Sequence, residues 1–86
     1  MTHAEILKRL QPVFDDLFGA SELLLCDATR REDVPDWDSF THILLLMSVE
    51  SEFAIKFSAQ EIVKIRDLPD LLRAIATEAS ADGGHP

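Results

Sequence analysis

The sequence is poor in cysteine and in basic residues, and it has no long hydrophobic run. A single cysteine cannot form a disulfide within the chain, and no basic and apolar leader precedes the first predicted helix, so a reducing cytoplasm is expected. There are 8 Lys and Arg residues against 16 Asp and Glu residues, a formal net charge of −8 without any basic cluster. This surface would repel nucleic acid, and it would either attract partners with basic surfaces or serve solubility alone. The longest apolar run is far too short to span a membrane.

The composition is otherwise that of one small folded domain. The chain has 86 residues, of which 47% are hydrophobic and 28% charged, a balance that excludes disorder. A chain this short can bury only a simple core, for which a few packed helices suffice. No internal repeat is visible.

The run VPDWDSF, residues 34–40, separates a loop from the most apolar segment of the chain. Pro35 disfavours helical backbone at Val34, and the Asp-Trp-Asp cluster after it is turn-like, so a helix is predicted to begin at Ser39. From there to Phe53, apolar residues recur at spacings of three and four on more than one face. The pattern predicts a central helix that is largely surrounded by other structure.

Ser39 has two possible roles at the start of this helix. As the N-cap, its hydroxyl would accept a hydrogen bond from a backbone N–H two or three residues later. If Asp38 caps the helix instead, Ser39 becomes the first helical residue and its hydroxyl points into water. A phosphodiester on that oxygen would then lie at the positive end of the helix dipole. We expect the second arrangement, which suits covalent attachment.

The segment Asp38-Ser39-Phe40, with an acidic loop before it and an apolar helix ending in VESEF after it, resembles the Asp-Ser-Leu signature of acyl carrier proteins. The resemblance covers residues 6–75 and includes the spacing of all the predicted helices. In that family the serine carries 4′-phosphopantetheine, which implies the same attachment at Ser39 and makes the chain a phosphoprotein. Phe40 replaces the usual Leu or Met, and this departure bears on partner recognition.

The resemblance implies a monomeric carrier and not an enzyme. A separate phosphopantetheinyl transferase would load Ser39 from coenzyme A, and the thiol of the arm would hold acyl groups as thioesters for partner enzymes with basic docking surfaces. A thiol with an unperturbed pKa of about 8.5 needs no activation by the carrier. The alternative is an unmodified helical adaptor that binds a protein through the same surface. The predicted recognition residues lie on or beside the central helix: Asp38, Phe40, Ile43, Leu44, Met47, Glu50 and Glu52.

The pathway is suggested by the charge of the central helix. Carriers of fatty acid synthesis present a strongly acidic second helix, whereas residues 39–53 contain only Glu50 and Glu52, and Leu44 is predicted to point outward. The Trp-Asp-Ser run looks more like carriers of polyketide, mixed peptide or cell-envelope pathways. We therefore expect a specialised pathway, with fatty acid synthesis as the alternative.

One amphipathic helix and a long loop precede the central helix. Thr2 and Glu5 have the spacing of a capping box, Pro12 should bend the helix without ending it, and Gly19 should end it. The predicted buried face comprises Ile6, Leu7, Leu10, Val13, Phe14, Leu17 and Phe18. The loop over 20–37 should let the two helices run roughly parallel. Its predicted packing residues are Leu23, Leu24, Leu25, Val34 and Trp37, with Cys26 as a small buried hydrophobe and Thr29 capping a short turn.

Two shorter patterns follow the central helix. After an extended or turn segment over 54–57, Ser58 and Glu61 form a second capping box that opens a short helix. Asp67 is predicted to cap a last helix with Pro69 in its first turn. The buried stripe of that helix is Leu68, Leu71, Leu72, Ile75 and Ala79. The predicted fold is an all-α four-helix bundle over residues 1–80, with three longer helices, a short third helix and a long first loop, followed by a flexible tail over 81–86.

Other chemistry finds less support in the sequence. Ser39 and His42 are three residues apart and could form a nucleophile and base pair, but no acid orients the histidine and no Gly-x-Ser-x-Gly turn is present. His42 is instead expected to be a partly exposed surface residue. A calcium loop starting at Asp36 fails because its sixth position is Thr41 and its twelfth is Met47. The three histidines are too scattered to form a zinc site with the cysteine.

Overall fold

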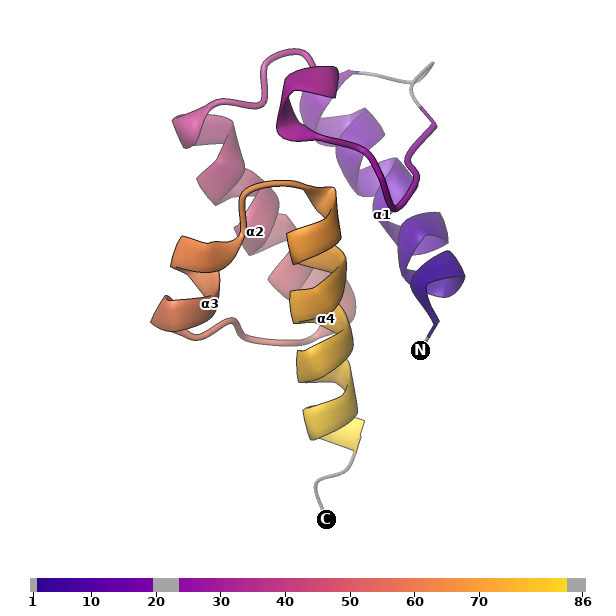
Figure 1. Cartoon of the computed structure of the whole chain (residues 1–86), viewed down its shortest axis with the longest axis vertical. Coiled ribbons are helices and arrows are strands. Elements are labelled where there is room, and N and C mark those ends of the chain that lie inside the picture. Colours follow the sequence, from indigo (N-terminus) through magenta and orange to yellow (C-terminus); the bar gives the residue numbers. More distant parts are fainter. Residues whose placement is uncertain (1, 20–23, 84–86) are drawn as a thin grey trace.

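The computed structural model describes residues 2–19 and 24–83, with side chains up to Ala79. The elements are α1 (His3–Phe18), the 3₁₀ helix η1 (Arg31–Asp33), α2 (Ser39–Phe53), α3 (Ala59–Lys64) and α4 (Leu68–Gly83) (Figure 1). The described residues contain no β-strand. The predicted all-α bundle of three longer helices and a short third helix is therefore confirmed.

Local sequence signals set the bounds of α1. The Thr2 hydroxyl accepts a hydrogen bond from the Glu5 N–H at 3.2 Å, and the Glu5 carboxylate accepts one from the Thr2 N–H at 2.8 Å. Gly19 ends the helix with φ of 62°, a left-handed conformation that glycine adopts without steric cost. Pro12 lies inside α1 and does not end it. Both predicted ends of this helix are confirmed.

Helices α1 and α2 run in opposite directions (Figure 1). Arg9, in the first half of α1, binds Glu52 near the end of α2, while Phe14 in the second half of α1 contacts Trp37 just before α2. The expectation of roughly parallel helices was wrong. The loop before α2 is bound to the start of α4, because the Thr29 carbonyl accepts a hydrogen bond from the Leu68 N–H at 3.3 Å. The loop thus brings the start of α2 to the end of the bundle at which α1 ends.

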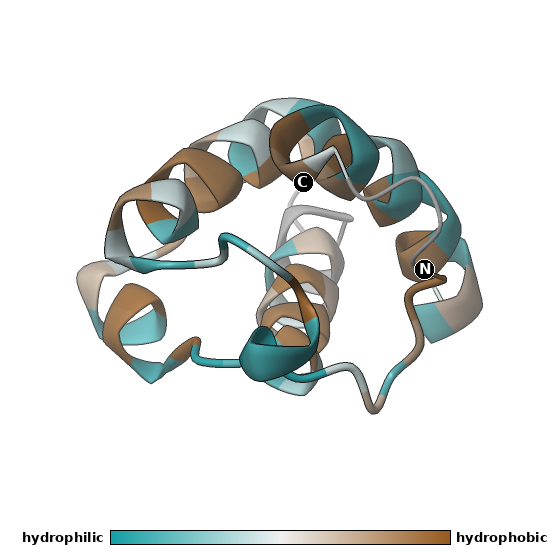
Figure 2. Cartoon of the chain, turned by 90° about the horizontal axis from the view of Figure 1, so that it is seen from above, coloured by the Kyte–Doolittle hydropathy of each residue, from teal (hydrophilic) through white to brown (hydrophobic). Residues whose placement is uncertain are grey.

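The core lies between the three longer helices and includes residues from the connections. Trp37, Ile55 and Phe57, all outside helices, are less than 9% exposed. Figure 2 shows hydrophobic and hydrophilic residues distributed around each helix, with the hydrophilic η1 on the outside of the bundle. The predicted stripe of α4 is confirmed, since Leu68, Leu71, Leu72 and Ile75 are fully buried and Ala79 is partly buried. The fully buried residues of α1 and α2 are Ile6, Leu10, Phe14, Leu45 and Val49.

The long loop packs differently from the prediction. Val34 and Trp37 are buried as predicted and Leu25 is partly buried, but Leu24 is 82% exposed. Leu23 lies outside the described residues. Cys26 is exposed, so its prediction as a buried hydrophobe was wrong.

The predicted capping role of Thr29 was also wrong. Its buried hydroxyl accepts a hydrogen bond from the Cys26 N–H at 2.9 Å and so closes a turn before η1. The start of η1 is closed by Asp33, whose carboxylate accepts from the Arg30 N–H at 2.9 Å. The threonine side chain points back along the chain and is therefore not available to the helix after it.

Two acidic side chains at the start of α4, Asp67 and Asp70, bind backbone N–H groups. The predicted capping box of Ser58 and Glu61 opens α3 as expected. Asp67 directly precedes α4, but its carboxylate accepts from the backbone N–H of Arg31 at 2.7 Å and so joins η1 to α4. Asp70 instead accepts from the N–H of Asp67 at 3.3 Å. The helix continues to Gly83 and includes residues 81–83, which the sequence analysis assigned to the tail.

The start of α1 and the end of α4 lie toward one end of the bundle, and α2 begins at the other (Figure 1). Within the part of the chain that the structure describes, no helix is long and apolar enough to cross a membrane.

Candidate functional site

A tight turn lies directly before the start of α2. The Trp37 N–H donates to the Val34 carbonyl at 3.3 Å, which closes a four-residue turn with Pro35 in its second position. Asp36, in the third position, has φ of 69°. Proline followed by a residue of positive φ is the pattern of a type II turn, and aspartate tolerates the left-handed region better than most residues. The loop therefore ends where the sequence predicted.

Asp38 caps α2 and leaves Ser39 exposed as its first residue. The Asp38 carboxylate accepts from the N–H groups of Phe40 and Thr41, both at 3.0 Å, and the Thr41 hydroxyl accepts from the Asp38 N–H at 2.8 Å. Hydrogen bonds from the Thr41 N–H and then from its hydroxyl hold the pKa of Asp38 below its ordinary value. No hydrogen bond of the Ser39 hydroxyl is found among the described residues. The predicted arrangement, with Asp38 as the cap, is the observed one.

His42 is not placed to activate Ser39. Its Nδ1 accepts a hydrogen bond from the Trp37 indole N–H at 2.9 Å, so this nitrogen is used within the fold. Burial, followed by the positive charge of Arg31, lowers the pKa of His42. The side chain is partly exposed, as predicted. This geometry does not support a nucleophile and base pair.

One side of α2 is apolar and faces solvent. Phe40, Ile43 and Met47 are 70%, 59% and 60% exposed, and their spacing of three and four places them on one face of the helix. We call these three residues the apolar face. Leu44, predicted to point outward, is only partly exposed. The expectation that α2 is largely surrounded by other structure was wrong for this side, while the opposite side is buried.

Glu50 and Glu52 lie at the far end of α2 from Ser39, and both are bound within the chain. The Glu50 carboxylate accepts from the Phe57 N–H at 2.8 Å. Glu52 binds Arg9 with N to O distances of 3.2 and 3.3 Å, and the Arg9 guanidinium lies over the Phe53 ring at 4.3 Å. Of the predicted recognition residues, Asp38 and the apolar face lie near Ser39, and the two glutamates do not.

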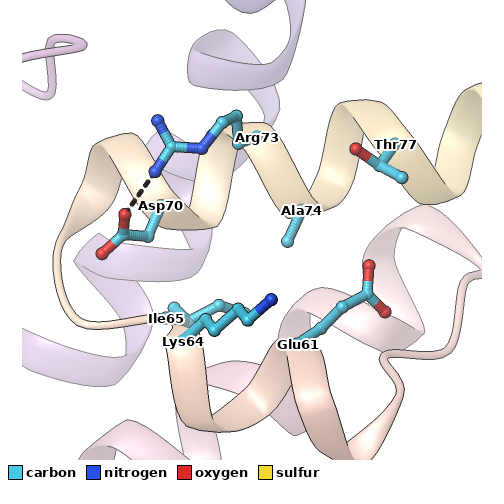
Figure 3. A pocket seen from close by; sticks show the side chains of 7 residues that line it. All are labelled: Glu61, Lys64, Ile65, Asp70, Arg73, Ala74 and Thr77. Carbon is cyan, nitrogen blue, oxygen red and sulfur yellow. Dashed lines mark hydrogen bonds and ion pairs between the residues drawn. The ribbon is translucent and has the colours of Figure 1, made fainter.

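Several hollows lie outside the apolar face. One, of about 550 Å³, adjoins the start of α2 and is lined by Arg31, Glu32, Val34, Pro35, Asp36, Trp37, Asp38 and Asp67. Another, of about 220 Å³, lies between α3 and α4 (Figure 3), where Arg73 pairs with Asp70 at 2.6 Å and Lys64 extends below Ala74. A third, of about 700 Å³, is lined by residues of α1 and α2: Pro12, Val13, Asp16, Leu17, Ser48, Ser51 and Glu52. No group of three or more His, Cys, Asp or Glu residues that could hold a metal ion is found among the described residues.

Three contacts of the site were not found by sequence reasoning. Two are the hydrogen bonds of Trp37 to His42 and of Glu50 to Phe57, which span five and seven positions. Each joins a residue of α2 to a residue outside the helix, so helical periodicity gave no signal for them. The Arg31 side chain, which donates to the Trp37 carbonyl at 3.1 Å, was likewise missed.

A four-helix bundle with an exposed serine directly after the capping aspartate of its second long helix has an acyl-carrier-like fold, as the sequence resemblance implied. The solution NMR structure of the holo acyl carrier protein from Geobacter metallireducens is similar over 93% of this chain and 92% of that chain. The TM-score is 0.82 and the sequence identity is 29%. No protein-family model matches the sequence. The similarity points to a carrier rather than an enzyme.

Proposed function

We propose that this chain is an acyl carrier protein whose Ser39 carries 4′-phosphopantetheine. The observation that carries the proposal is the capping of α2 by Asp38, because it leaves Ser39 exposed in the first turn of the helix. A phosphodiester on the Ser39 oxygen would lie at the N-terminal end of α2, where the helix dipole favours an anion. The similar NMR structure is of a holo acyl carrier protein, which supports the same loading here.

The loading reaction requires little from this chain. A phosphopantetheinyl transferase supplies the base and the metal, and the Ser39 oxygen attacks the pyrophosphate of coenzyme A. A phosphorus–oxygen bond to Ser39 forms, the bond to the nucleotide breaks, and the transferase takes the serine proton. The thiol of the arm then holds acyl groups as thioesters for partner enzymes. Since His42 is bound to Trp37, the carrier provides position and access and not acid–base catalysis.

Partner enzymes are proposed to dock on the apolar face. Exposed Phe40, Ile43 and Met47 provide apolar area for burial, and Asp38 stands beside them at the end that carries Ser39. The net charge of −8 attracts partners with basic surfaces from a distance. Leu44, Glu50 and Glu52 contribute at the edge of this surface. The carrier is further proposed to be a cytoplasmic monomer.

A specialised pathway is the proposed setting. The first turn of α2 contains no acidic residue, and Glu50 and Glu52, near the end of the helix, are bound within the chain. The proposed docking surface is therefore more apolar than acidic. This favours polyketide, mixed peptide or cell-envelope synthesis, with fatty acid synthesis as the alternative carrier role. The apolar face would equally serve an unmodified adaptor that binds a protein, and this is the second candidate function.

Intact mass after incubation with coenzyme A and a promiscuous transferase tests the proposal. The wild-type chain should gain one phosphopantetheine and the Ser39→Ala variant none. Ser51→Ala, an exposed serine of the same helix, is the matched control and should load normally. Because Ser39 is exposed and alanine is the better helix former, Ser39→Ala should change the free energy of unfolding by no more than about 0.5 kcal/mol. Loading of Ser39→Ala would refute the attachment site, and a wild type that several transferases fail to load would favour the adaptor.

A further inference from the structure

Trp37 and His42 join three parts of the bundle at the end where α2 begins. The indole N–H donates to His42 Nδ1 at 2.9 Å, and the two ring planes are 22° apart. Trp37 also packs edge-on against Phe14, with centroids 5.4 Å apart, and lies 6.1 Å from Phe18. The imidazole also lies close enough to the Ile65 backbone, directly after α3, for that backbone to act on its charge. The pair thus ties the loop before α2 to α1 and to the α3–α4 connection.

This arrangement requires a neutral imidazole. An indole N–H can only donate, and an imidazole nitrogen can accept only when it carries no proton. The nearby Ile65 backbone favours the protonated ring, as a carbonyl facing a ring N–H would. A neutral His42 with its proton on Nε2 satisfies both contacts. A second proton, on Nδ1, would face the indole N–H and break that hydrogen bond.

Few charged groups act on the imidazole. From η1, Arg31 lies near it, with its guanidinium donating to the Trp37 carbonyl at 3.1 Å and its backbone N–H donating to Asp67. Asp38 is turned toward the N–H groups of its own helix. The α1 side chains packed against its partner Trp37 are the uncharged Phe14 and Phe18, and the connection after α3 contributes a backbone group near the imidazole. Burial first and Arg31 second keep the pKa of His42 below its ordinary value of 6.5.

We propose that the Trp37–His42 pair is a pH-sensitive clamp, which holds the loop before α2 against the bundle while His42 is neutral and releases it on protonation. Trp37 directly precedes the cap residue Asp38, so release frees the segment that positions Ser39. The clamp acts whether or not Ser39 is modified. Since the folded pKa of His42 lies below its unfolded value, its contribution to stability is present above the unfolded pKa and is lost as the pH falls through the folded pKa.

An NMR titration of the unmodified chain tests the clamp directly. Trp37 is the only tryptophan, so a single indole N–H signal reports its hydrogen bond. At pH 8 the ¹⁵N shifts of His42 should show the proton on Nε2. On acidification the indole signal should move with the protonation of His42, at a midpoint below 6.5. A proton on Nδ1 at pH 8, or an indole signal that does not follow His42, would overturn the proposal.

A non-titrating variant provides the second test. In His42→Gln the amide oxygen can accept from the indole and the amide N–H₂ can donate to the carbonyl. Between pH 7.5 and 5.0, the melting temperature of the wild type should fall further than that of His42→Gln. The control His3→Gln, which changes an exposed histidine of α1, should show the same fall as the wild type. Equal losses in the wild type and His42→Gln would contradict the clamp. If His42→Gln fails to fold, the titration of the wild type decides. Neither measurement uses the loading reaction, so failure here is distinct from failure of the proposed function.

Discussion

Replacement of Glu50 by alanine should destabilise the fold, although this glutamate was predicted from the sequence to recognise partners. Its carboxylate accepts the N–H of Phe57 at 2.8 Å, across the connection between α2 and α3. Phe57 is only 7% exposed, so water cannot readily replace the lost acceptor. Glu50 therefore anchors the connection to the end of α2.

The expected loss follows from the single backbone donor that is left unpaired. A buried N–H without an acceptor costs about 1–3 kcal/mol, and the better helix propensity of alanine returns a few tenths of a kcal/mol at most. For a domain of this size each kcal/mol lowers the melting temperature by roughly 4–8 °C. Glu50→Ala should thus melt roughly 5–20 °C below the wild type. It should still fold, because small domains have about 5–15 kcal/mol of stability.

Thermal melting and hydrogen exchange of the Phe57 amide provide the assay. The amide should exchange faster in Glu50→Ala, while Glu50→Gln, whose amide oxygen can still accept, should lie between that variant and the wild type. Glu52→Ala is the control for charge, because it also removes one negative charge but breaks only the ion pair with Arg9, whose two side chains are 40% and 42% exposed. Such pairs contribute about 0–1 kcal/mol. A Glu50→Ala protein that melts within about 2 °C of the wild type, with unchanged exchange at Phe57, would refute this account.

Two further predictions concern the start and the exposed side of α2. Since the hydrogen bonds from Thr41 lower the pKa of Asp38, its stabilising contribution is present above the unfolded pKa, near 3.8, and is lost as the pH falls through the folded pKa. Between pH 5 and pH 2, the melting temperature should therefore fall more for the wild type than for Asp38→Asn, because asparagine keeps a capping oxygen that does not titrate. Identical pH profiles of the two proteins would contradict the capping argument. Met47→Ser should change the melting temperature little but slow loading by the transferase, whereas Leu46→Ser, at a position only 5% exposed, should lower the melting temperature strongly. Unchanged loading kinetics for Met47→Ser would count against docking on the apolar face.

Helix ends could be predicted from the sequence because capping involves residues at most three positions apart. The capping boxes of Thr2 with Glu5 and of Ser58 with Glu61 formed as expected, and Asp38 caps α2. Ser39 was found by the same local reasoning, together with the family resemblance. The parts of the site that depend on residues adjacent in the chain were therefore predictable.

Contacts between distant segments were not predictable in this way. The path of the loop before α2 involves the hydrogen bond between Thr29 and Leu68, which are far apart in the sequence. The use of Glu50 as an anchor depends on how the chain turns after α2. Ile43 and Met47 were named as recognition residues, but their hydrophobicity alone does not show that they are exposed, because a helix that is apolar on two sides gives no sign of which side the fold leaves open.

The arrangement of the chain ends has a consequence for tethering. The start of α1 and the end of α4 lie toward one end of the bundle, away from the start of α2 (Figure 1). A flexible linker fused to either terminus, or a bead or sensor surface attached through one, would approach the bundle from the end opposite Ser39. Ser39 would then lie at the end of the bundle away from the support. Surface-based measurements can therefore use either terminus without crowding Ser39.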